Sequence, residues 1–347
     1  MSYRRGLLVT VAVAAVIAVA AAGISAAGQS GPTDGPEFEE FETESTISDP
    51  ISQSGGIDPD SSVAGDGVIV VDDSNTNRFS RGDIQPLVEA IGRTGHEVRF
   101  HRRGNLSESL SGADALVVID PGSPYNEDEL DTVDEFVEDE GRLLILGEPT
   151  RTSVSAGLFG AEITQRESEL TEIGSRFDVQ FDTQYVYDQT TNDGTYQQVV
   201  AEPHEEAALP PDDGTSLDGV DEVAFDVATE VRSTSDGEPV LVTSSEARTA
   251  GAANGRRHTL AIRDDDVLAV GDASFISAGR HNVGDTNVFL ASVVEFLVSA
   301  EGGGVDSGLD DPVSTDTGTD GGSDDASGNE TDSDGGGGDG GNSTIMG

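Results

Sequence analysis

Residues 67–148 contain three short apolar runs in which no polar residue alternates: VIVV at 68–71, ALVVI at 115–119 and LLIL at 143–146. Such runs are typical of strands that are buried on both faces of a parallel sheet. Apolar residues at helical spacing lie between them at 81–94 and 127–140, and each of these stretches ends before a glycine that suits a helix terminus. Strands and helices that alternate this closely predict parallel, right-handed crossovers.

A weaker version of the same pattern continues to residue 300. Residues 152–163 are small and mixed, and they indicate no element. We expect one α/β domain over 67–300 with a doubly wound, mostly parallel sheet. Its further strands are predicted at 96–101, 179–186, 197–201, 223–225, 228–231, 240–243, 258–262 and 267–270, and its further helices at 170–177 and 286–299.

The charge of the chain is extreme. Its 347 residues carry 67 acids against 18 basic residues, all of them arginine, for a formal net charge of -49. Residues 67–300 alone hold 45 of the acids and 16 of the arginines, so the folded part shares the excess. Such self-repulsion strains a compact state at ordinary ionic strength, but in molar salt the Debye length falls to about 3 Å. The composition favours a haloarchaeal protein over an acidic partner-binding protein.

Missing residue types exclude several functions. Nucleic-acid backbones are neutralised by clustered Lys and Arg, and the domain has only two basic pairs, so we expect no nucleic-acid partner. The lack of lysine excludes Schiff-base chemistry and a Walker A loop. The lack of cysteine excludes disulfides, thiolate metal sites and a cysteine nucleophile. No histidines have metal-ligand spacing and no G-x-S-x-G motif occurs, so we predict no metal, no cofactor and no serine-hydrolase elbow.

Residues 1–27 predict a membrane anchor or an export signal. Arg4 and Arg5 precede an uncharged apolar run over 6–27, which is long enough to span a bilayer. One interpretation is a single-pass anchor in the cell membrane with the domain outside the cell. The other is a twin-arginine signal that is cleaved near 25–27 and leaves a secreted protein. We favour the anchor, because the run is longer than in a usual signal and Tyr3 replaces the expected small hydroxyl residue.

Two polar segments flank the domain. Residues 28–66 form an acidic linker rich in Gly, Pro and Ser, and residues 301–347 form a Gly/Ser/Asp-rich tail that we expect to be disordered. Three Asn-x-Ser/Thr patterns, at Asn105, Asn329 and Asn342, are candidate glycosylation sites on an exported chain.

Several short motifs together resemble one known family. They are 68–72 with Asn75, Asn77 and Phe79, then 95–98, 141–144, 170–177, 187–192, 271–276 and 287–297. Over about 67–298 the chain resembles the domain-of-unknown-function family 4350. The resemblance implies a class I glutamine amidotransferase-like or flavodoxin-like fold, similar also to the extracytoplasmic part of gliding-type ABC transporter auxiliary proteins. An amidotransferase presents a cysteine at a strand-to-helix elbow, and this chain has none, so that activity is not carried over.

Acids and amides follow the predicted strands. The carboxyl ends of strands are where open α/β sheets bind ligands. Carboxylates there bind cations through oxygen or divide into a general acid and a general base, although strand-end Asp and Asn more commonly cap helices and shape turns. We assign no catalytic and no metal-binding residue. The candidate ligand-binding residues are Asp72, Asp73, Asn75, Asn77, Asp120, Glu148 and Asp272.

Three functional hypotheses follow. The first is a non-catalytic binding or scaffold module of an envelope or transporter-like complex, with the membrane and envelope proteins as partners. The second is an exported hydrolase that uses the strand-end carboxylates, and the third is a small-ligand or sugar sensor. The fold analogy and the missing nucleophiles favour the first.

Overall fold

The computed structural model describes residues 50–157, 160–205, 207–209 and 217–299, without the side chains of residues 153–163. All of these residues lie within one compact unit of the chain. The predicted anchor at 1–27, most of the predicted linker and the predicted tail at 301–347 lie outside the described residues. Among the helices that are described, none is both long enough and apolar enough to cross a bilayer.

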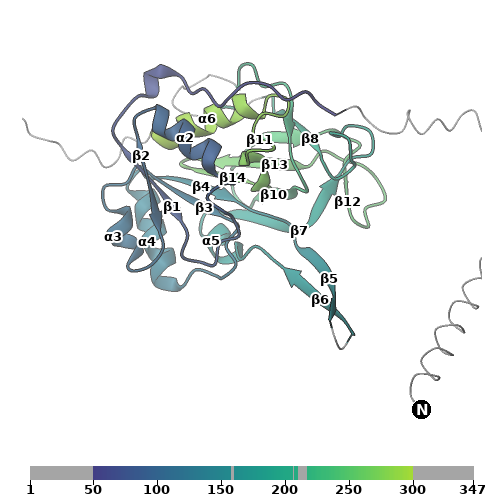
Figure 1. Ribbon diagram of the computed structural model, residues 1–347, viewed down its shortest axis with the longest axis horizontal. Coiled ribbons are helices and arrows are strands. Elements are labelled where there is room, and N and C mark those ends of the chain that lie inside the picture. The colour runs from purple at the N-terminus through teal and green to yellow at the C-terminus, as the bar shows by residue number, and fades with distance from the viewer. Residues whose placement is uncertain (1–49, 158–159, 206, 210–216, 300–347) are drawn as a thin grey trace, which may run out of the picture. The chain divides into compact units, whose positions relative to one another are not determined.

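A nine-stranded sheet forms the centre of the fold, in the order β2-β1-β3-β4-β14-β13-β11-β8-β9 (Figure 1). The first five strands in this order are parallel, and each later pairing is antiparallel. Seven of the nine strands therefore point the same way, and only β13 and β8 run against them, which confirms an α/β fold with a mostly parallel sheet. The bounds are β1 Val68–Asp72, β2 Glu97–His101, β3 Ala115–Ile119, β4 Arg142–Leu146, β8 Val200–Pro203, β9 Val223–Ala224, β11 Glu238–Thr243, β13 Thr259–Asp264 and β14 Val267–Val270.

Helices cover both faces of this sheet. Helices α2 (Gln85–Arg93) and α6 (Thr286–Val298) pack together on one face, and α3 (Leu106–Leu110), α4 (Glu127–Glu138) and α5 (Thr171–Arg176) lie on the other (Figure 1). In β1, Ile69 and Val71 join the core beneath α2 and α6, whereas Val68 and Val70 join the core beneath α3 and α4. Both faces are therefore buried, which explains why the strands lack polar alternation.

Helix starts follow their local capping chemistry. Helix α4 begins where it is predicted, because Asn126 and Glu129 form a reciprocal capping box, which stabilises such helices by about 1 kcal/mol. Helix α2 begins four residues later than predicted. Ser80 and Asp83 bond to each other's backbone and close a turn, and a proline occupies the first turn of the helix that follows.

Two small sheets stand apart from the central one. Strands β10 (Thr229–Ser233), β7 (Val179–Tyr187) and β12 (Arg248–Thr249) form the first. Strands β5 (Arg151–Gly157) and β6 (Gly160–Arg166) form a hairpin that projects from the body (Figure 1). The sequence indicates no element at 152–163, because its small and mixed residues show no apolar period to detect.

The described end of the predicted linker lies along the domain. Ile57 is buried in the core beneath α2, and its carbonyl accepts a hydrogen bond from the Arg93 guanidinium. Gln53 forms a β-bridge with Val283, and a short 3-10 helix, η3, covers Ser61–Val63. A second 3-10 helix, η4 (Ser274–Ile276), follows β14 at the carboxyl edge of the sheet.

Candidate functional site

A cavity of about 360 Å³ opens at the carboxyl edge of the central sheet. Because parallel strands end at the same edge, the segments that follow β1, β3, β4 and β14 all contribute to its walls. The hairpin adds a further wall. The lining residues are Arg78, Phe79, Asp83, Ile84, Ile119, Asp120, Glu148, Pro149, Arg151, Arg166, Ala273, Ser274 and Ser277.

Asp120 connects three segments of this site. It lies directly after β3 with φ 35°, a left-handed conformation that costs energy for a residue with a side chain. Its carboxylate accepts hydrogen bonds from Arg78 at 3.0 Å and from the Ser168 hydroxyl. Arg78 also bonds back through its amide to the Asp120 carbonyl at 3.0 Å and donates to the Glu167 carbonyl. The strained backbone is thus held by contacts from the loops after β1 and β6.

Glu148 and Asp272 form a buried pair of acids at the ends of β4 and β14. Burial, followed by the nearby Asp272, raises the pKa of Glu148 to about 8, although Arg151 opposes the shift. Glu148 accepts hydrogen bonds from Arg151 at 2.5 and 3.2 Å and from the Ala273 amide at 3.3 Å. Burial also raises the pKa of Asp272, which accepts bonds from the amides of Asp226 at 2.7 Å and Ser274 at 2.5 Å. A raised pKa of this kind is a common property of functional carboxyls.

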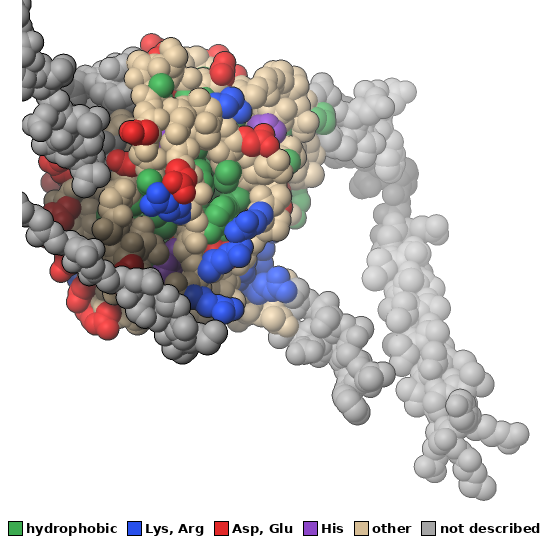
Figure 2. Space-filling view, turned by 60° about the vertical axis from the view of Figure 1, so that its left-hand side comes forward, with side chains coloured by type: hydrophobic (Ala, Val, Ile, Leu, Met, Phe, Trp, Pro, Cys, Tyr) green, Lys and Arg blue, Asp and Glu red, His purple; other side chains and the backbone are tan. Residues whose placement is uncertain are grey.

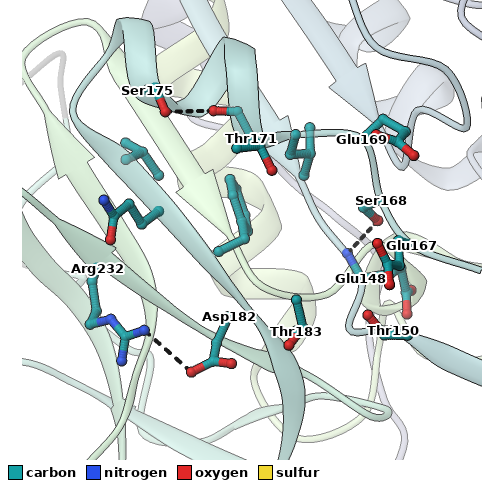
Figure 3. A pocket seen from close by; sticks show the side chains of 14 residues that line it. Glu148, Thr150, Glu167, Ser168, Glu169, Thr171, Ser175, Asp182, Thr183 and Arg232 are labelled. Carbon is teal, nitrogen blue, oxygen red and sulfur yellow. Dashed lines mark hydrogen bonds and ion pairs between the residues drawn. The ribbon is translucent and has the colours of Figure 1, made fainter.

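A second cavity, of about 230 Å³, lies on the other side of Glu148. In Figure 3, Glu148 and Ser168 border one side of it, and Arg232 with Asp182 borders another, joined at 3.3 Å. The Glu148 amide donates to the Ser168 hydroxyl at 3.1 Å. Ser168 in turn donates to Asp120, so one serine connects the two acids between the cavities.

The loops after β1 and β3 bind each other instead of opening a crevice. The Asn75 carbonyl accepts the amides of Gly122 at 2.9 Å and Ser123 at 3.0 Å. Gly122 is required there, because a Cβ at that position would lie 2.8 Å from the Thr76 carbonyl oxygen. The Asn77 side chain accepts the Asn75 amide at 3.0 Å and donates to the Ile119 carbonyl at 2.9 Å. Both asparagines therefore hold the loop, and neither lines the cavity described above.

Only part of the predicted set of acids comes together. Asp120 and Glu148 line the first cavity, and Asp272 lies beside Glu148. Asp72 is fully buried and accepts bonds from the Ser74 hydroxyl and, at 2.6 Å, the Tyr125 hydroxyl. Asp73 pairs with Arg102 at 2.9 Å. These two acids do not line the cavity.

None of the three arginines that line the cavity is among the predicted site residues. Arg78, Arg151 and Arg166 come from a loop and from the two ends of a hairpin that the sequence does not indicate. A usable signal exists, since arginines are scarce in this chain, and Arg78 and Arg151 each lie in the segment that follows a predicted strand and its acid.

The remaining predictions concern surface sites and metals. Asn105 is exposed and caps α3 by accepting the Ser107 amide, so it is accessible as a glycosylation candidate. Asn329 and Asn342 lie outside the described residues. Within the described part, His, Asp and Glu side chains form no group of three that could hold a metal ion.

Comparison with solved structures identifies similar folds. The mmIFT52 N-terminal domain aligns with 67% of this chain and 98% of its own length, at a TM-score of 0.51 and 11% identity. A ThuA-like protein from Parabacteroides merdae aligns with 67% of this chain and 89% of its own length, at a TM-score of 0.37 and 12% identity. At these identities the likeness concerns the fold alone.

Comparison with sequences gives the family. No curated protein sequence matches the chain. A family model does match residues 84–294, which is more than half of the chain, and its description is domain of unknown function, DUF4350. The predicted resemblance to this family is confirmed, and the chain belongs to the DUF4350 family.

Proposed function

We propose that this chain is a non-catalytic module that binds a small ligand at the carboxyl edge of its sheet. The observation that carries the proposal is the 360 Å³ cavity, where segments after four strands and a hairpin converge. Ligand pockets in proteins are typically about 300–1,000 Å³ and combine apolar walls with a few placed polar groups. Phe79 and Ile84 supply apolar wall here, and guanidinium, carboxyl and hydroxyl groups supply the polar contacts.

The pairing of the side chains supports binding over chemistry. Asp120 is bonded to Arg78 and Ser168, and Glu148 is bonded to Arg151, so both carboxyls are engaged by the protein itself. The chain has no cysteine or lysine to act as a nucleophile. Its serines at the cavity, Ser274 and Ser277, have no histidine among the lining residues. Groups arranged in this way position a ligand more readily than they attack it.

The proposal includes the setting in which the module works. The apolar run at 6–27 supports a single-pass anchor in the cell membrane, or alternatively twin-arginine secretion, with the domain outside the cytoplasm. The charge of -49 supports a halophilic, haloarchaeal source. The strand order β2-β1-β3-β4-β14 matches the 2-1-3-4-5 order of flavodoxin-like sheets, which supports kinship with class I glutamine amidotransferase-like folds. In this setting the module binds its ligand as one part of an envelope complex.

One specific observation supports an exported hydrolase as a second candidate. Glu148 borders the cavity, and burial and the nearby Asp272 raise its pKa, as a general acid requires. Release of nitrophenol from p-nitrophenyl phosphate and p-nitrophenyl acetate tests this candidate. It requires turnover that Glu148→Gln reduces by a factor of about 100 or more. Turnover that is absent, or unchanged in Glu148→Gln, excludes it.

Ligand-dependent stability tests the binding function. We expect the full chain, in 2 M KCl, to unfold at a higher temperature in the presence of at least one of four probes: phosphate, succinate, glucose or glycine. A ligand at about 100 times its Kd stabilises a protein by about 2.7 kcal/mol. Ser277→Leu narrows the cavity and should abolish the shift, whereas Ser235→Leu, at an exposed site elsewhere, should retain it. The absence of any shift, or an equal shift in Ser277→Leu, contradicts the proposal.

A further inference from the structure

We propose that the cavity takes the oxyanion group of its ligand, a carboxylate or a phosphate, between Arg151 and Arg166 on the hairpin and Arg78 on the opposite wall. This inference rests on the binding function proposed above and adds the chemical class of the ligand. Guanidinium groups suit this role, because their planar N–H donors match the oxygens of carboxylate and phosphate.

The arginines are concentrated against the composition of the chain. Only 18 of 347 residues are basic and 67 are acidic, yet three arginines line one cavity. In Figure 2, several basic side chains form a patch on the lower part of the surface drawn, and other basic side chains lie apart from it beside acidic ones. A halophilic surface has no need of such a patch for solubility, so the patch calls for another explanation.

The register of the hairpin places two of these charges directly opposite each other. Arg151 in β5 pairs with Arg166 in β6. Directly opposed residues in an antiparallel pair have Cβ atoms about 4.5–5.5 Å apart, and like charges in that position destabilise the pair. An acid at either position would have formed a favourable pair in a chain rich in acids. An anion bound between the two guanidinium groups converts this repulsion into attraction.

The acids that line the cavity are engaged by neighbouring groups. Arg78 pairs with Asp120 at 3.0 Å, and Asp83 is engaged by the Ser80 amide at 2.7 Å. Glu148, whose pKa burial and the nearby Asp272 raise, pairs with Arg151.

Arg166 is the most available of the three cations. It is exposed and forms no ion pair with any residue that the structure describes. Arg78 and Arg151 are already paired with acids, so Arg166 is the cation that remains for an anionic ligand. The Ser277 hydroxyl also lines the cavity and adds a neutral donor for the remaining oxygens of a ligand.

The test measures binding to the full chain by isothermal titration in 2 M KCl at pH 7. The probes are inorganic phosphate, succinate and neutral glucose. Chloride is present at the same concentration in every titration, so each probe competes with the same amount of chloride for the cavity. Arg166→Gln removes the unpaired cation of the cavity. Arg103→Gln is the matched control, because Arg103 is also exposed and lies outside the cavity. Thermal unfolding of both variants checks that each one folds.

The inference predicts that phosphate or succinate binds and glucose does not. Since a hydrogen bond to a charged group contributes more than a neutral one, Arg166→Gln should weaken anion binding by about tenfold or more, and Arg103→Gln should leave it within twofold. Phosphate preferred over succinate identifies a phosphate ligand, and the reverse identifies a carboxylate. Equal anion binding by both variants overturns the inference. Binding of glucose alone overturns the anion class and retains the binding function, and binding of no probe overturns both.

Discussion

Replacement of Glu148 by glutamine tests the buried acid pair beneath the cavity. The pKa of Glu148 rises from 4.5 to about 8 in the folded protein, because of burial and the nearby Asp272. The folded state therefore binds a proton that the unfolded state releases above pH 4.5. This contribution to stability is fully present below about pH 4.5 and is lost as the pH rises through about 8.

The size of this contribution to the free energy of unfolding follows from the change in the pKa of Glu148. One pKa unit corresponds to about 1.36 kcal/mol, so 3.5 units set an upper limit of about 5 kcal/mol. Water that enters the cavity beside an ionised Glu148 lowers this figure, and we expect about 2–4 kcal/mol. Glutamine carries no charge at any pH and keeps an oxygen for the Ala273 amide and Arg151. Glu148→Gln should therefore be more stable than the wild type at pH 9 by this amount and nearly equal to it at pH 5.

Urea unfolding in 2 M KCl at pH 5, 6, 7, 8 and 9 measures this difference. The control is Glu167→Gln, which removes one exposed carboxylate from a nearby loop and should follow the wild-type curve within about 0.5 kcal/mol. If the curves of Glu148→Gln and the wild type run parallel from pH 5 to pH 9, Glu148 does not hold its proton and the account of the pair is wrong.

Three further predictions concern stability and partners. Tyr125→Phe removes the hydroxyl that donates to buried Asp72 and should destabilise the protein by about 1–3 kcal/mol in urea unfolding; an unchanged midpoint contradicts the structural role of Asp72. Arg256→Ala removes two hydrogen bonds, at 2.7 and 2.6 Å, to buried Glu230. Because Arg256 is about half exposed and Arg232 and His258 also lie 3.3 Å from Glu230, we expect a loss of about 1 kcal/mol in urea unfolding; an unchanged midpoint contradicts a stabilising role for this pair. Cross-linking of the tagged chain in membranes of its host, in high salt, should recover envelope proteins in stoichiometric amounts, and recovery of a lone monomer opposes the scaffold hypothesis.

The parallel half of the fold could be predicted because its cause is local. The runs at 68–71, 115–119 and 143–146 are apolar throughout, and the structure buries both of their faces. The hairpin β5–β6 could not be predicted, since its sequence shows no apolar period that would indicate a strand. The ends of the antiparallel strands could be predicted only approximately, because turns and long-range pairing determine them.

The candidate site could also be predicted only in part. Asp120, Glu148 and Asp272 could be predicted, because strand ends in a parallel sheet meet at one edge. Asp72 obeys the same rule and yet serves the core, since Tyr125, 53 residues away in sequence, covers it. The pairing of Arg151 with Arg166 depends on the register of an unpredicted hairpin, so no local pattern reveals it.

An ordered anion in the cavity would be the most direct test of this account. Crystals of the full chain, grown in molar KCl and soaked with selenate, allow the anion to be located by its anomalous scattering. The account predicts a selenium peak between the guanidinium groups of Arg151 and Arg166, with the selenate oxygens about 3 Å from their nitrogens, that is lost in crystals of Arg166→Gln. Anomalous peaks only at other surfaces, or a peak that persists in Arg166→Gln, would contradict it.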